Sequence, residues 1–105
     1  MEKLERKLPS GKEVIVRGVT ALDDILAYQL ISADVDKDNP LAAGIMHRTA
    51  LVLLSLAVED GEVCTPPGTM NDVHKRLASF KIGDWREVER AYAELNEPQE
   101  VTPGE

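Results

Sequence analysis

The sequence predicts an α+β fold that is predominantly helical, with an N-terminal β-hairpin packed on a bundle of about four helices. Three observations lead to this prediction. Residues 2–17 place apolar side chains among charged ones on both sides of a turn-forming segment, as paired short strands do. Later segments repeat apolar residues every three or four positions, which is typical of helices. The length of 105 residues suits one domain with one core.

The predicted hairpin turns at Pro9-Ser10-Gly11-Lys12, a composition typical of turns. Leu4 and Leu8 precede the turn, and Val14 to Val16 follow it between charged neighbours. An isolated hairpin is only marginally stable in water, so its apolar face must pack against later elements.

A first helix is predicted over residues 22–33. Thr20 can act as its N-cap, with the carboxylate of Asp23 three residues on, which approaches a capping box. The polar residues Asp23, Asp24 and Gln29 point away from the apolar positions. The apolar face expected to cover the core consists of Leu22, Ile25, Leu26, Leu30 and Ala33.

Pro40 separates this helix from a second one, predicted from Leu41 to Glu59. Its apolar residues point almost all round the axis, as in a helix covered on most sides, so we expect it to be central. Asp60-Gly61 is expected to end the helix and residues 62–68 to form a loop.

A third helix is predicted from Met70 to Phe80, and Asp84 is expected to cap the start of a fourth. The folded domain is predicted to cover residues 1–96. Residues 97–105 contain two prolines, three acids and a glycine, a composition that predicts a disordered acidic tail.

Composition excludes several classes of protein. Nineteen acidic against twelve basic residues give a net charge of −7, and the basic residues do not gather in one patch, which disfavours nucleic-acid binding and a transcriptional regulator. The longest apolar run, 50–58, is far shorter than the roughly 20 residues of a membrane span. A single cysteine and a charged N-terminus without a signal sequence indicate a cytoplasmic protein.

No cofactor or metal is expected. Asp34, Asp36 and Asp38 alternate like the first ligands of a calcium loop, but Asn39 and Ile45 occupy the positions that require glycine and glutamate. The remaining ligand types, Cys64, His47 and His74, are not at ligand spacing, so His47 and His74 are expected to be ordinary surface residues.

No catalytic residue is expected either. Single, scattered glycines exclude a phosphate-binding loop. The carboxylates of Glu59, Asp60 and Glu62 are more simply a solvated turn than an acid/base group. We therefore expect a protein without enzymatic activity, while a small enzyme or ligand-binding protein remains an alternative that would require a deep pocket with convergent polar groups.

An aromatic-rich stripe on the fourth helix is the candidate protein interface. It consists of Trp85, Val88, Tyr92 and Leu95, and it holds two of the four aromatic residues of the chain. Tryptophan and tyrosine commonly anchor protein interfaces. The alternative is that the stripe only closes the core.

Short motifs in a fixed order resemble those of the small tail assembly chaperones of tailed bacteriophages. Leu8-Pro9-Ser10-Gly11 resembles their leucine-proline-x-glycine strand pair, and Arg17-Gly18-Val19-Thr20 their approach to the first helix. Glu59-Asp60-Gly61-Glu62 resembles their acidic turn, and Lys81-Ile82-Gly83-Asp84 introduces the last helix. The resemblance covers residues 7–96.

This resemblance implies a non-enzymatic protein of the bacterial host cytoplasm. Its partner would be the long helical tape measure protein, or other tail proteins, during virion morphogenesis. A similar opening of strands and a helix also occurs in baseplate and hub-assembly proteins, so a structural subunit retained in the virion is an alternative. The sequence leaves open whether the chain also forms a homo-oligomer.

Overall fold

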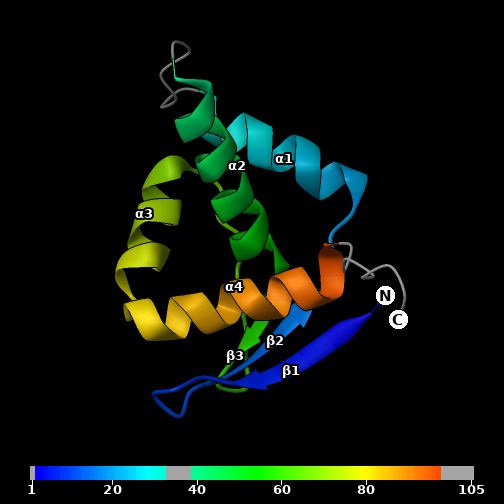
Figure 1. The fold of residues 1–105 in the computed structure, drawn as a ribbon, viewed down its shortest axis with the longest axis vertical. Coiled ribbons are helices and arrows are strands. Elements are labelled where there is room, and N and C mark those ends of the chain that lie inside the picture. The colour runs from blue at the N-terminus through cyan, green and yellow to red at the C-terminus, as the bar shows by residue number, and fades with distance from the viewer. Residues whose placement is uncertain (1, 33–38, 98–105) are drawn as a thin grey trace, which may run out of the picture.

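The computed structural model describes residues 2–32 and 39–97, and within them it contains four helices and one four-stranded antiparallel sheet (Figure 1). The α+β, mostly helical class is therefore confirmed. In chain order the elements are β1 (Lys3–Lys7), β2 (Glu13–Arg17), α1 (Ala21–Ile31), α2 (Pro40–Ser55), β3 (Leu56–Glu59), β4 (Glu62–Val63), α3 (Met70–Ala78) and α4 (Ile82–Asn96).

The N-terminal hairpin forms as expected. β1 and β2 pair antiparallel from Lys3 opposite Arg17 to Lys7 opposite Glu13. In the turn, the Leu8 amide donates to the Lys12 carbonyl over 2.7 Å, and Gly11 takes a φ of 97°, which glycine adopts without steric cost.

The prediction that the second helix continues to Glu59 is wrong. α2 ends at Ser55, and the chain continues as β3, which pairs with β2 and turns into the two-residue strand β4. Asp60 and Gly61 have φ values of 50° and 81°, as a tight two-residue hairpin turn requires. A helix through residue 59 would have left one edge of β2 without hydrogen-bond partners, so tertiary pairing overrides helix periodicity here.

The main core lies between the sheet and α4, which crosses one sheet face (Figure 1). Its buried side chains come from the hairpin turn, β2, β3, α2, α3 and α4, so the helices do not form one separate bundle. Its buried members are Leu8, Val14, Val16, Val52, Leu53, Leu56, Val73, Val88, Ala91 and Tyr92. At the rim, Arg6 of β1 donates to Glu87 of α4 over 2.9 Å and also pairs with Glu94.

The expected role of Asp84 as an N-cap is also wrong, because α4 begins two residues earlier, after Lys81. The Asp84 carboxylate instead accepts hydrogen bonds from the Ser10 hydroxyl (2.6 Å) and the Ser10 amide (3.0 Å). These bonds tie the hairpin turn to α4, and they lower the pKa of Asp84. The carboxylate thus joins two distant segments.

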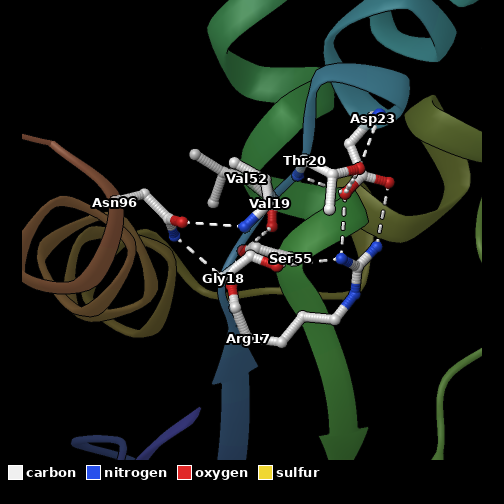
Figure 2. A network of polar contacts seen from close by, with 8 residues as sticks. All are labelled: Arg17, Gly18, Val19, Thr20, Asp23, Val52, Ser55 and Asn96. Carbon is white, nitrogen blue, oxygen red and sulfur yellow. Dashed lines mark hydrogen bonds and ion pairs between the residues drawn. The ribbon is translucent and has the colours of Figure 1, made fainter. Parts of the chain in front are cut away.

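At the start of α1 the predicted capping box of Thr20 and Asp23 is present (Figure 2). The Asp23 carboxylate also accepts two hydrogen bonds from the Arg17 guanidinium, at 2.9 and 3.0 Å. Asp23 is buried, and Ala27 and Ile31 continue its stripe at four-residue spacing. This stripe, and not the predicted one, faces α2.

The predicted core face of the first helix therefore points to solvent. Leu22, Ile25 and Leu26 are 63%, 52% and 38% exposed, whereas Leu30 is partly buried. Ala33, the last predicted member, lies outside the described residues. The physical reason is that Arg17 holds Asp23 on the inner side and so sets the rotation of the whole helix about its axis.

Asn96, the last residue of α4, also binds the chain near the start of α1 (Figure 2). Its side-chain oxygen accepts from the Val19 amide over 2.8 Å, and its side-chain nitrogen donates to the Arg17 carbonyl over 3.3 Å. The segment between β2 and α1 is thus held from both sides.

α1 packs mainly against α2, and together they form a helical hairpin beside the main core (Figure 1). A second, smaller cluster of Ala27, Ile31, Ala50 and Leu54 joins the two helices. None of the described helices is both long and apolar enough to span a bilayer.

Leu53 and Leu54 belong to different clusters, which are bridged by the partly buried Leu30, Leu51 and Met70, so we expect Leu53→Ala and Leu54→Ala to differ in where they act. Both side chains are 4% exposed, but Leu53 lies in the main core and Leu54 in the smaller cluster. Leu53→Ala should lower the free energy of global unfolding by about 2–5 kcal/mol. Leu54→Ala should chiefly accelerate amide hydrogen exchange in α1, measured by NMR. Equal global destabilisation without extra exchange in α1 would contradict this division.

The Arg17–Asp23 pair should make stability depend on pH. The Arg17 hydrogen bonds lower the pKa of Asp23 in the folded protein, so their stabilisation is present at neutral pH and is lost below about pH 4. Asp23→Asn should therefore destabilise the protein by about 1–3 kcal/mol at pH 7, as expected for hydrogen bonds to a charged group. In urea titrations the difference from the wild type should shrink towards pH 2. A difference independent of pH would argue against the pair.

Candidate protein-binding surface

The residues of α1 and α2 that are exposed as a whole are uncharged, and only the side chains of Asp24 (51% exposed) and Arg48 (39%) add charge to this surface, although 30% of the chain is charged. The other two helices differ, since α4 exposes Arg86, Arg90 and Glu94. In α1 and α2 the exposed positions are Ala21, Leu22, Ile25, Leu26, Tyr28, Gln29, Pro40, Leu41, Gly44 and Ile45. A surface of this kind is unusual for a solvated face and typical of a protein contact site.

The few charges of the hairpin have partners within the chain. Asp23 is bound by Arg17, and His47 Nε2 lies 2.9 Å from Asp24 Oδ1. Arg48 donates to Glu89 at 3.1 Å and to Glu97 at 2.6 Å. Asp23 and Arg48 are thus bound within the chain, whereas the Asp24 side chain stays 51% exposed beside His47.

A groove of about 490 Å³ lies between α1 and the first half of α2. Tyr28 forms one wall, and its ring stacks on the His47 imidazole with centroids 4.0 Å apart. Ala43 and Gly44 lie on the α2 side, where small side chains let another backbone approach closely. The remaining lining residues are Ile31, Ser32 and Pro40.

His47 is thus part of this groove, although the sequence suggested an ordinary surface residue. His74 is exposed on α3, as expected. The groove could have been anticipated from one signal: residues 21–31 and 40–55 contain only Asp23, Asp24 and Arg48 as charged residues. Two consecutive helices so poor in charge cannot both present ordinary solvated faces.

The expected interface stripe packs against the main core of the chain. Val88 and Tyr92 are 0% and 5% exposed, and Trp85 and Leu95 pack against the same cluster partly buried. Phe80 tilts against Trp85 at a centroid distance of 5.6 Å, and the Arg48 guanidinium lies 5.5 Å from the Tyr92 centroid. This packing accounts for the aromatic residues without a partner protein.

A polar cluster surrounds the end of β3. Glu59 accepts from Lys12 at 2.7 Å and from Arg76 at 2.5 Å. Burial raises the pKa of Glu59, but the two cations outweigh this effect and lower it overall. Burial raises the pKa of the neighbouring Cys64 thiol. The carboxylate is thus held ionised and the thiol protonated, the reverse of what a general acid or a nucleophile requires.

The other candidate polar groups remain apart. Asp60 accepts from the Glu13 amide at 2.9 Å, and Glu62 is exposed on β4. Over residues 2–32 and 39–97, no three His, Cys, Asp or Glu side chains are placed to hold a metal ion. The alternating aspartates 34, 36 and 38 and the predicted tail from residue 98 onward lie outside these ranges.

Comparisons of the chain with protein-family models, with curated proteins and with solved structures find no match. Its own surface and the resemblance in its short motifs are therefore the basis for a functional proposal.

Because Tyr92 is buried, we expect Tyr92→Ala to act on folding. The lost burial and the resulting cavity should lower the free energy of unfolding by about 3–5 kcal/mol, as for other large buried rings. Denaturant unfolding measures this loss, and binding assays below the lowered melting temperature should show no separate defect. A stable variant with impaired binding would instead establish the stripe as an interface.

Proposed function

We propose that this chain is a non-enzymatic assembly chaperone that binds an amphipathic helix of another protein through the α1–α2 hairpin. The observation that carries the proposal is the hairpin's charge-poor exposed surface with its open groove. In binding of this kind, a helix places apolar anchors spaced by three and four residues into a hydrophobic groove.

The groove has features that suit a helical client. Tyr28 offers a large, half-polar ring at its edge, and Gly44 offers an approach unobstructed by a side chain. A Cβ atom added at Gly44 would meet no heavy atom within 4 Å, so the space above this glycine is open. Tyrosine side chains are common anchors at interfaces. An apolar helix ridge could therefore lie against Gly44 and Ala43.

The resemblance to phage tail assembly chaperones supplies the biological setting of the proposal. In that setting the client is the tape measure protein, a long helical chain that must stay soluble until tube subunits polymerise round it. An apolar groove on an acidic protein meets this need, because the groove covers apolar client residues while the net charge of −7 opposes aggregation of the complex.

Filling the groove should abolish client binding while the domain stays folded. A Cβ atom at Gly44 meets open space and leucine is a better helix former than glycine, so Gly44→Leu should not destabilise α2. Co-expression with a phage tape measure protein, the client of this proposal, should then yield much less soluble client. In purified complexes, affinity should fall about 30-fold or more, as for loss of an interface anchor.

A matched control is Gly83→Leu, since Gly83 also lies in a helix, α4, with open space at its Cβ position. This variant should bind and solubilise the client like the wild type. Circular dichroism of both variants verifies folding. Undiminished client capture by a folded Gly44→Leu variant would refute the groove as the binding site.

A further inference from the structure

One carboxylate beside the groove has no permanently charged partner among the described residues. The Asp24 side chain is 51% exposed, and the basic group that it contacts is His47, whose Nε2 lies 2.9 Å from Asp24 Oδ1. Nε2 itself is buried and makes no hydrogen bond of ordinary geometry within the described chain. A histidine is a cation only when it is protonated. The negative charge of Asp24 is therefore left without a permanent counter-charge.

The other carboxylates that form ion pairs in residues 2–32 and 39–97 each contact a lysine or an arginine. Glu59 pairs with Lys12 and Arg76. Glu97, whose side chain is 43% exposed, still pairs with Arg48. An acid in the first turn of a helix, such as Asp24 in α1, stabilises the helix end, but this interaction requires no side-chain contact. The carboxylate of Asp24 thus stays open to a ligand.

An exposed aromatic ring lies one helical turn further along α1. Tyr28 is 57% exposed and belongs to the groove, where its ring stacks on His47. Residues four apart on a helix are neighbours, so the Tyr28 ring and the Asp24 carboxylate lie side by side. Ring faces attract cations, and a guanidinium group both stacks on rings and forms forked hydrogen bonds to carboxylates. The two side chains together therefore suit an arginine.

We propose that Asp24 and Tyr28 form a subsite for an arginine of the client helix, located where the apolar side of that helix meets its polar side. This inference rests on the proposed function, because the subsite adjoins the groove that holds the client. Charge complementarity supports an arginine as the occupant, since the chain carries a net charge of −7 and the lining of the groove supplies no lysine or arginine. The apolar groove alone accepts many amphipathic helices, and the subsite adds specificity.

Pairs of synthetic amphipathic helical peptides test the subsite. All share leucines spaced by three and four residues. The two members of a pair differ at one boundary position, which holds either arginine or citrulline, an uncharged analogue of nearly the same shape, and successive pairs move this position along the helix. Fluorescence anisotropy measures binding of the labelled peptides to the full chain. In the pair with the matching position, the arginine peptide should bind at least about fivefold more tightly, and added salt should reduce this preference.

Variants of the chain assign the preference to its two side chains. Asp24→Asn should lower the preference for arginine to about twofold or less and leave binding of the citrulline peptide unchanged. Tyr28→Leu keeps an apolar side chain and should lower the preference about twofold. Asp72→Asn is the matched control, because Asp72 is also an exposed acid in the first turn of a helix, α3, and its replacement should preserve the preference. Circular dichroism verifies that the variants fold.

The outcomes separate the subsite from the groove. Equal affinity for arginine and citrulline in every pair would overturn the subsite, although binding of both peptides would still support the groove. An unchanged preference in Asp24→Asn, or its loss in Asp72→Asn, would also overturn the subsite. If neither peptide of any pair binds, the groove is refuted as a helix-binding site, and the subsite with it.

Discussion

The contact between Arg17 and Asp23 determines which side of α1 is buried and which side is exposed to solvent. The guanidinium lies at the end of β2 and the carboxylate in the first turn of α1, where it also completes the capping box with Thr20. Because a helix is rigid, holding one residue on its inner side sets the orientation of every other residue. Asp23, Ala27 and Ile31 therefore face α2, and the larger apolar side chains of α1 face solvent.

The rotation of α1 divides the chain into two regions of different physical character. One is a body with a main core, closed by α4 and by ion pairs such as that of Arg6 with Glu87. The other is the contact of α1 with α2, in which four side chains are buried, two of them alanines, while α2 also contributes to the main core. Small residues at the contact let α1 and α2 approach closely but bury little apolar area. We therefore expect α1 to be the less stable part of the fold, and it forms one side of the candidate binding surface.

Sequence periodicity succeeded where helices have one polar and one apolar side. In α4, periodicity identified the stripe that contains Val88 and Tyr92. The packing favours the interpretation that this stripe closes the core over the interpretation that it is a protein interface. In α1, periodicity selected the larger residues Leu22, Ile25 and Leu26 as the inner face, because a helix that is apolar on several sides has no unique inner direction. Likewise, nothing within residues 56–59 distinguishes a last turn of α2 from a strand. The Asp60-Gly61 pair was the available signal, since Asp-Gly is also a frequent hairpin turn.

The sequence by itself determined the fold class, the N-terminal hairpin, the existence of four helices and the capping of α1, because these depend on neighbours a few residues apart. Only the tertiary structure decided which side of α1 is buried, where α2 gives way to β3, and that Asp84 binds Ser10 instead of capping its own helix. Each of these depends on a partner distant in the chain: Arg17 and α2, the open edge of β2, and the hairpin turn. Local pattern fixes an element, but its rotation and boundaries follow from the hydrogen bonds and burial that the assembled fold makes available.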